Sequence, residues 1–548
     1  MTSNFTSQDI EIHIRKYRSL LKSSGSLHID QLIDSHLEMK SILHLKGDQD
    51  EVDIASFIYC LLRLPSCTSS VGEIILGQSY SVFKNAGFAA IINWKEVSAP
   101  GRRRKMFYDA KKRLAVYIAS VTDVDDIITL LTAFQIEWNK LHKKLANVKE
   151  PEKFVEKIIS PEDLGRIKNI WGKDYYNFLQ AIKNRRVSFT IKLLSGSYVE
   201  YAKSTSYWWK NITRNLHHLN IPKRPIYFVS SNTHSITNLL TRFATYEENE
   251  LITYLYSLEN PELIRFWEEI QSGDFLGSRE NFLYYIAKKY AHTHPEILQK
   301  KESLERNLGI HTIPASRFLD IDTQVIELSR LSKDKTLGQK IGSSLSFLIR
   351  SKAIILNIDY PLGWAAYQIL TTIGQNVDTV KGVYIMGKAA TLNGQIGDIL
   401  LPNTIYDHHT KNTYAFSNAF SAKDFTTIFK TGNVLDHQKS ISTKGTFLEN
   451  AEMVKNWFDA GYTIIEMEGG PYLNAVYEFV HYDRYEENQF VSLTNPPFEL
   501  GIAHYASDTP YSKAKNLGVR NLSYEGVEPT YAISLAILKK IIQREKSS

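Results

Sequence analysis

Cysteine is scarce in this sequence. Only Cys60 and Cys67 carry a thiol among 548 residues, and both lie in the helical-looking stretch IYCLLRLPSC. Two thiols cannot build a disulfide framework or a thiolate metal cluster. This cysteine usage fits a reducing compartment.

Long apolar runs and a dominant charge sign are also missing. No stretch approaches the roughly 18 uninterrupted apolar residues that cross a bilayer, and residues 1–17 lack the apolar core of a signal peptide. The formal charge of +6 is spread over 65 basic and 59 acidic side chains, so it identifies no partner. We therefore expect a cytoplasmic protein without a membrane or nucleic-acid partner.

The chain is too long for one ordinary core, which predicts two or more domains. Residues 1–220 show helical periods and almost no strand, so we expect a largely α-helical domain there with a regulatory, partner or assembly role. Its strongest helix carries an apolar stripe at steps of three and four residues: Ile127, Leu130, Leu131, Phe134, Trp138, Leu141 and Leu145. Ser160 and Pro161 predict a further helix start. The basic run 101–113 is interpreted as a solvated helix face, with RNA contact as the alternative.

The pattern changes after residue 220. Apolar strands alternate with helices, which predicts an α/β domain over residues 221–548 with its sheet buried on both faces. A helical insertion is expected at about 245–310. Residues 225–229 read as the first strand, although this strand could instead belong to the N-terminal domain.

Polar residues that follow apolar strands are the candidates for chemistry, because ligands bind at the carboxyl ends of strands in open α/β sheets. Four such places stand out: Asp359, the segment 387–398, the acids Glu466 and Glu468, and the pair Ser507 and Asp508.

Four segments in order resemble the nucleoside phosphorylase and nucleosidase superfamily: GKAATLNGQIGDILLP, STKGTFLEN, IIEMEGG and ASDTP. The resemblance covers about residues 350–548 and implies a three-layer α/β domain with a mixed central sheet. Its Ser-Asp-x-Pro ending and long N-terminal extension look most like nucleosidases that cleave AMP. Members of this superfamily are usually oligomeric, which implies a homo-oligomer.

The resemblance also implies site residues. Asp508 would meet the purine, Glu468 would hold the ribose with Met467 against the sugar, and Phe447 would stack on the base. Gly387, Ala389 and Ser507 lie in the same segments and are expected to contact substrate. Asp508 could instead cap a helix, Glu468 could join a structural ion pair, and Phe447 could be a core aromatic residue.

The chemistry of an N-ribosidic bond agrees with these roles. Cleavage develops positive charge on the sugar and negative charge on the base, so the site must protonate the base and anchor the ribose hydroxyls. Asp508 suits the first task only if it starts protonated, and an ionised Glu468 suits the second. Glu466 is expected among the substrate contacts, although bracing a loop or helix terminus fits it better.

The sequence departs from a phosphorylase pattern. Asp359 stands where phosphate would bind and would repel it, so water is the expected nucleophile. Asp359 or His234 would activate that water, and a structural or capping role is the alternative for Asp359.

Two lysines, Lys388 and Lys444, predict contacts to a 5′-phosphate, with plain solvent exposure as the alternative. His408 would lie beside the ribose. Paired histidines at 408 and 409 have no third ligand at a metal-binding spacing, so we predict no metal and no cofactor.

We therefore expect hydrolysis of the N-glycosidic bond of a purine nucleotide or nucleoside. The alternatives are phosphate-dependent cleavage of a purine nucleoside and a catalytically inactive nucleotide-sensing module.

Overall fold

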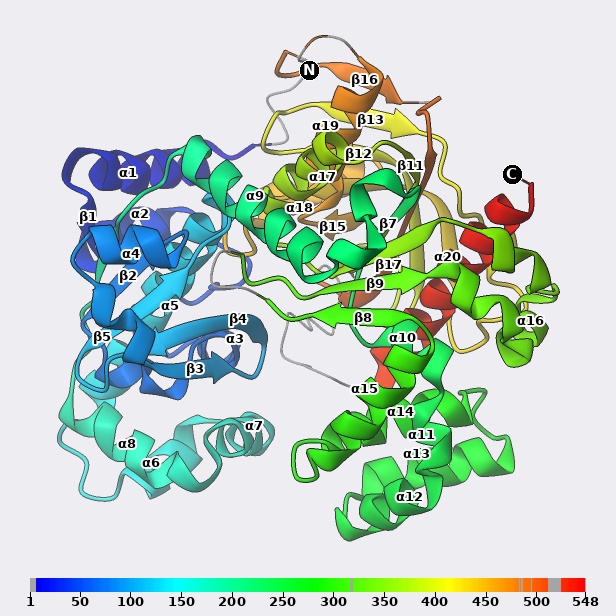
Figure 1. Ribbon diagram of the computed structural model, residues 1–548. Coiled ribbons are helices and arrows are strands. Elements are labelled where there is room, and N and C mark those ends of the chain that lie inside the picture. Colours follow the sequence, from blue (N-terminus) through cyan, green and yellow to red (C-terminus); the bar gives the residue numbers. More distant parts are fainter. Residues whose placement is uncertain are drawn as a thin grey trace.

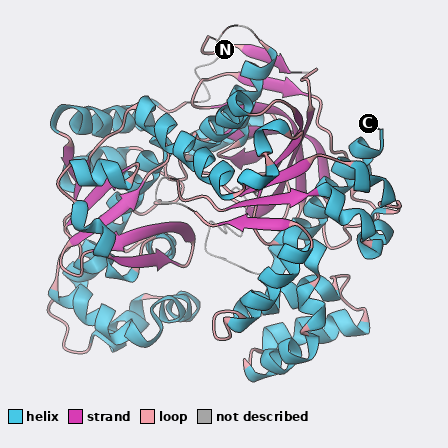
Figure 2. Cartoon of the chain, in the orientation of Figure 1, coloured by secondary structure: helices cyan, strands magenta, loops and turns pink. Residues whose placement is uncertain are grey.

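The computed structural model describes residues 6–315, 319–481, 483, 486–493, 495–510 and 524–547. Its strands form a six-stranded sheet within residues 26–193 and an eleven-stranded sheet within residues 226–508 (Figure 1). Helices surround both sheets (Figure 2). Among the described residues, no helix combines the length and apolar character that crossing a membrane requires.

The N-terminal sheet corrects the prediction of a largely helical domain. Its strands run in the order β1-β6-β2-β5-β4-β3. They are β1 (Ser26–His28), β2 (Glu73–Gly77), β3 (Lys95–Ala99), β4 (Arg102–Tyr108), β5 (Arg113–Tyr117) and β6 (Thr190–Leu193). These strands are short, and periodicity alone cannot distinguish a short apolar run from a helix segment. The basic run 101–113 is likewise wrong as a helix face, because it contains β4 and the start of β5, which pair antiparallel.

The helices of the N-terminal half include those that the sequence predicts. They are α1 (Gln8–Ser24), α2 (Ile33–Glu38), α3 (Ile54–Arg63), α4 (Tyr80–Asn85), α5 (Val121–Leu145), α6 (Pro151–Ile158), α7 (Pro161–Trp171), α8 (Tyr175–Asn184) and α9 (Tyr198–Asn215). Helix α5 contains the predicted stripe. Ser160 caps α7 by accepting a hydrogen bond from the backbone N–H of Asp163, as expected.

The eleven-stranded sheet contains both parallel and antiparallel pairs, which confirms the predicted mixed central sheet. The order is β16-β13-β12-β14-β15-β11-β7-β10-β9-β8, and β17 pairs with β11 and β12. The strands are β7 (Ile226–Ser231), β8 (Ile310–Ile313), β9 (Thr323–Glu327), β10 (Ile354–Asp359), β11 (Val380–Thr391), β12 (Ile399–Asp407), β13 (Thr413–Phe416), β14 (Val434–Ser442), β15 (Ile464–Glu466), β16 (Phe490–Leu493) and β17 (Glu499–Asp508). Strand β7 lies between β10 and β11, parallel to both, so the strand predicted at 225–229 belongs to this sheet.

Helices cover both faces of this sheet. They are α10 (Ser235–Thr241), α11 (Phe243–Tyr246), α12 (Glu248–Ser257), α13 (Pro261–Ser272), α14 (Arg279–Tyr290), α15 (Glu296–Asn307), α16 (Lys335–Ile341), α17 (Ala365–Asn376), α18 (Ala451–Asp459), α19 (Gly469–Val480) and α20 (Val527–Ser547). Alternate side chains of β7 enter opposite cores. Ile226 and Phe228 pack with α9, α17 and α19, whereas Tyr227 and Val229 pack with α10, α14 and α20.

Two further features position the site. Helices α12 to α15 occupy most of residues 245–310, the predicted insertion, and lie at one end of the sheet (Figure 1). The N-terminal core continues into the second half of the chain, because Leu43, Phe447 and Trp457 belong to one cluster of buried side chains. The exact domain boundaries at residue 220 stay a prediction.

Candidate functional site

Two cavities open where parallel strands of the large sheet end. Strands β10, β7, β11 and β17 are parallel neighbours, so their carboxyl ends share one edge. The carboxylate cavity, of about 370 Å³, is lined by Glu449, Glu466, Glu468 and Asp508 among others. The tyrosine cavity, of about 380 Å³, is lined by Tyr284, Tyr285, Tyr505 and Tyr531 among others. Both volumes lie within the range of small-molecule sites, so the chemistry of the lining has to distinguish them.

The carboxylate cavity brings together the two acids to which the sequence gives the main roles. Asp508 is the last residue of β17, and the Ser507 hydroxyl donates a hydrogen bond to its Oδ2 at 2.7 Å. Glu468 immediately precedes α19, and the backbone N–H of Gly363 donates to its Oε1 at 3.3 Å. Met467 lines the same cavity. Residues 40 positions apart in sequence thus face one space.

Glu466 is almost fully buried, and its carboxyl group stabilises the start of helix α19. Its Oε2 accepts hydrogen bonds from the backbone N–H groups of Glu468 and Gly469, both at 2.6 Å, and Oε1 accepts from the Ser442 hydroxyl. The start of α19 leaves such N–H groups without helical partners, and a carboxylate satisfies them. These contacts match the bracing role that the sequence suggested for Glu466.

Glu449 is a site residue that the sequence analysis missed. It lies in the loop between β14 and α18, is only 5% exposed, and lines the carboxylate cavity. Burial raises the pKa of Glu449 to about 8, against a smaller opposing effect of the Thr443 hydroxyl. At neutral pH its carboxyl therefore carries a proton that it can donate. The available signal was an acid directly after the apolar pair Phe447 and Leu448.

The N-terminal half supplies a further part of the wall. Tyr59 and Arg63 from α3, Arg102 from β4 and Asp126 from α5 line the carboxylate cavity. Arg102 and Asp126 form an ion pair at 2.8 Å, and the Arg102 Nε is buried without a hydrogen-bond partner in the described part of the chain. The Arg63 guanidinium lies 3.5 Å from the centre of the Tyr59 ring. Nothing in the sequence indicated that these residues meet the segments near 468 and 508.

The Tyr59 hydroxyl joins the two halves of the chain at this wall. It lies 2.9 Å from the Thr446 hydroxyl, 387 positions away in sequence. The Tyr59 ring also contacts the Phe447 ring, with centroids 5.4 Å apart. The N-terminal half therefore forms part of the cavity wall.

Three predicted substrate contacts lie elsewhere. Phe447 is fully buried and belongs to the N-terminal core, so its ring packs against protein and does not face the carboxylate cavity. Lys444 forms an ion pair with Glu11 at 3.0 Å. His408 shares a separate cavity of only about 10 Å³ with Lys444, and its ring contacts Trp457. The predictions that Lys444 meets a phosphate and that His408 lies beside the ribose are corrected accordingly.

The remaining predicted residues divide between the two cavities. Ala389 lines the carboxylate cavity, whereas Lys388 and Ser507 line both cavities. His234 precedes α10 and lines only the tyrosine cavity. Asp359 ends β10, and its side chain is not among the described residues that line either cavity.

Gly387 lies inside the sheet, where there is no room for a side chain. It is buried in β11 opposite His504 of β17, and a Cβ added there would lie 2.9 Å from the His504 Nδ1. Burial lowers the pKa of His504 to about 4, so the ring is neutral. Glycine at position 387 is therefore required for packing, and its backbone carries Lys388 to the cavities.

Metal chemistry has no obvious place within the described residues. No group of three or more histidine, cysteine, aspartate or glutamate side chains is arranged there to hold an ion. The carboxylates of the cavity are instead spread around its wall.

Comparison with known proteins assigns the chain to a family. The model of the Family of unknown function DUF6909 matches residues 29–543. The chain belongs to this family. A search of curated proteins found no match.

Solved structures similar to this DUF6909 member include three enzymes. The 5′-methylthioadenosine/S-adenosylhomocysteine nucleosidase from Colwellia psychrerythraea is 11% identical, with 44% of this chain and 90% of that chain covered and a TM-score of 0.28. AMP nucleosidase from Bacteroides thetaiotaomicron is 13% identical, with 45% and 85% covered and a TM-score of 0.26. Uridine phosphorylase from Schistosoma mansoni is 8% identical, with 61% and 93% covered and a TM-score of 0.32. At these scores the function has to be argued from the site itself.

Proposed function

We propose that this protein hydrolyses the N-glycosidic bond of a purine nucleotide or nucleoside and releases the free base. The observation that supports the proposal best is the shared cavity of Asp508 and Glu468. The two acids resemble the base and ribose contacts of nucleosidases, and they come from different strand ends of one sheet. The cavity also has the volume of a small-molecule site.

The reaction needs a proton on the leaving base. The bond between C1′ of the ribose and the base nitrogen breaks, the electron pair leaves with the base, and a proton neutralises it. Asp508 and Glu449 both line the cavity, and Glu449 is the one whose pKa is raised to about 8. Asp508 contacts the purine in this proposal, and Glu449 provides a protonated group within the same wall.

The ribose requires an anchor and a nucleophile. Glu468 accepts hydrogen bonds from the ribose hydroxyls, and its negative charge also stabilises the cation that develops on the sugar. Water adds to C1′ and loses a proton. The base for this water stays a prediction, because His234 lines the tyrosine cavity and Asp359 lines neither cavity. Cytosolic assembly into a homo-oligomer stays a prediction.

A panel of purine nucleosides and 5′-nucleotides tests the proposal. Each compound is incubated with the full-length protein, with and without inorganic phosphate, and free base is measured by chromatography. We expect base and the corresponding sugar or sugar phosphate in both conditions. Release that strictly requires phosphate would replace hydrolysis by phosphorolysis. Nucleotide binding without any base release would favour the sensing module.

A further inference from the structure

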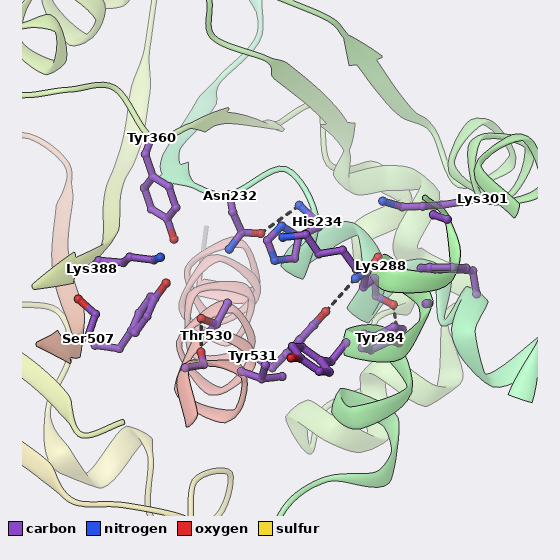
Figure 3. A pocket seen from close by; sticks show the side chains of 18 of the residues that line it. Asn232, His234, Tyr284, Lys288, Lys301, Tyr360, Lys388, Ser507, Thr530 and Tyr531 are labelled. Carbon is purple, nitrogen blue, oxygen red and sulfur yellow. Dashed lines mark hydrogen bonds between the residues drawn. The ribbon is translucent and has the colours of Figure 1, made fainter. Parts of the chain in front are cut away.

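The carboxylate and tyrosine cavities share part of their walls. Tyr360, Lys388 and Ser507 line both of them. In Figure 3 these three residues lie on one side of the tyrosine cavity, opposite Lys288 and Lys301. The two cavities are therefore neighbours, with Lys388 at their boundary.

Lys388 is the natural partner for a phosphate at this junction. It is exposed, and among the described residues it has no ion-pair or hydrogen-bond partner. The other cations of the carboxylate cavity are already engaged, since Arg102 pairs with Asp126 and Arg63 lies against the Tyr59 ring. An ammonium group without an acidic neighbour stabilises a phosphate most effectively.

The tyrosine cavity is suited to a second ring. The Tyr284 and Tyr531 rings are stacked, with centroids 5.1 Å apart, and Phe243 lies in the same wall. Asn238, which is 4% exposed, donates a hydrogen bond to the Tyr531 hydroxyl at 2.8 Å, whereas its Oδ1 is buried without a partner among the described residues. An unpaired buried carbonyl oxygen is costly, and an N–H or O–H group of a ligand would satisfy it.

The size of the tyrosine cavity decides between a bare phosphate and a larger group. Its volume of about 380 Å³ is similar to the volume of about 370 Å³ of the carboxylate cavity, in which a whole nucleoside is proposed to bind. A single phosphate at Lys388 would leave the ring-lined space empty. Lys288 and Lys301 on its far wall add positive charge for an anionic ligand, and Lys301 also pairs with Glu305 at 3.5 Å.

We infer that the substrate is a nucleotide whose 5′-phosphate carries a second ring-bearing group, as in a dinucleotide, and that this group binds in the tyrosine cavity. The inference rests on the proposed function and extends it. The first nucleoside lies between Glu468 and Asp508, the linking phosphates lie at Lys388, and the second ring lies against Tyr284 and Tyr531.

The test compares three compounds with increasing length. AMP ends at the first phosphate, ADP adds charge without a ring, and diadenosine 5′,5′-diphosphate adds both charge and a second adenosine. Adenine release gives kcat/KM for each. We expect kcat/KM to be roughly tenfold higher for the dinucleotide than for AMP, because ring stacking and a charged contact each contribute. ADP should gain less than the dinucleotide.

Substitutions of Lys288 and Lys301 in the wall of the tyrosine cavity test whether this cavity binds the second ring of the dinucleotide. Lys301→Gln and Lys288→Gln should lower the ratio of dinucleotide to AMP kcat/KM by about threefold or more each. Lys300→Gln is the matched control, because Lys300 is exposed on the same helix, pairs with Glu247 and lies outside the lining of the cavity. It should leave the ratio unchanged.

Failure of the inference differs from failure of the proposed function. Equal kcat/KM for AMP and the dinucleotide, with a ratio that Lys301→Gln and Lys288→Gln do not change, would overturn the inference and leave nucleotide hydrolysis intact. No adenine from any of the three compounds would remove the proposed function and this inference together.

Discussion

The carboxylate of Glu466 accepts a hydrogen bond from the backbone N–H of Glu468 at 2.6 Å. The first acid of the Glu-Met-Glu segment therefore holds the second in place, while the second faces the cavity. The two acids therefore lie in different environments, which explains how a buried strand end tolerates both. Glu466 is stabilised by protein donors, and Glu468 lines the carboxylate cavity.

Glu466→Gln should weaken both the fold and the reaction. The glutamine side chain has one acceptor oxygen instead of two, so either the Ser442 hydroxyl or the two N–H groups at the start of α19 lose their acceptor. An unsatisfied buried donor costs about 1–3 kcal/mol. Urea unfolding should show this loss, and kcat should fall more than KM rises because Glu468 moves. Glu452→Gln, an exposed substitution in the first turn of α18, should change neither quantity.

Gly387→Ala should destabilise the sheet without any change in charge. The added methyl would lie 2.9 Å from the buried His504 ring, and overpacking of this kind costs about 1–3 kcal/mol. Thermal unfolding measures the effect. Gly165→Ala is the contrasting variant, since its methyl meets nothing within 4 Å in helix α7. That variant should unfold at the same temperature or higher, and an equal loss in both would refute the steric explanation.

Stability should fall as pH rises from about 7 to 9, above the range in which the buried His13 and His504, whose pKa values burial lowers to about 4, act in the opposite direction. The folded protein keeps protons on Glu449 and Glu466, whose pKa values burial raises to about 8 and about 7 from an ordinary 4.5. The unfolded chain has already released these protons, so folding takes up protons and higher pH disfavours it. Glu449→Gln should flatten the dependence of the unfolding temperature on pH. A variant with the same slope as the parent would show that Glu449 is not buried in its neutral form.

The two lysines predicted to bind phosphate should now differ. Lys388→Gln should raise KM for purine 5′-nucleotides by roughly tenfold, because a charge-assisted contact is lost. Lys444→Gln should leave KM unchanged, since Lys444 pairs with Glu11 beside a separate small cavity. Nucleosides, which lack the phosphate, should be less sensitive to the first variant. Equal effects of both variants would contradict this assignment.

Three residues predicted at strand ends, Glu468, Ser507 and Asp508, line one cavity. Ser507 and Asp508 end β17, which is parallel to β11, whereas Glu468 follows β15, which is antiparallel to β11. The walls contributed from far along the chain could not be predicted. Tyr59 and Thr446 meet across 387 positions, and no local pattern encodes that contact.

Other differences have local causes. Phe447 sits in a segment that resembles a base-stacking loop, yet the N-terminal core packs directly against it and encloses its ring. The short strands β2 and β5, five residues each, carry too few apolar positions to be separated from helix. In both cases tertiary packing between distant segments determines the outcome.

The rate of base release by Asp508→Asn and Glu468→Gln tests the central claim most directly. Asp459→Asn on the exposed end of α18 serves as the control for the loss of an aspartate, and circular dichroism confirms that each variant is folded. We predict that both site variants lose at least about 100-fold in kcat for a purine nucleotide that the parent cleaves, while the control stays active. Folded site variants that release base at the rate of the parent would contradict the account.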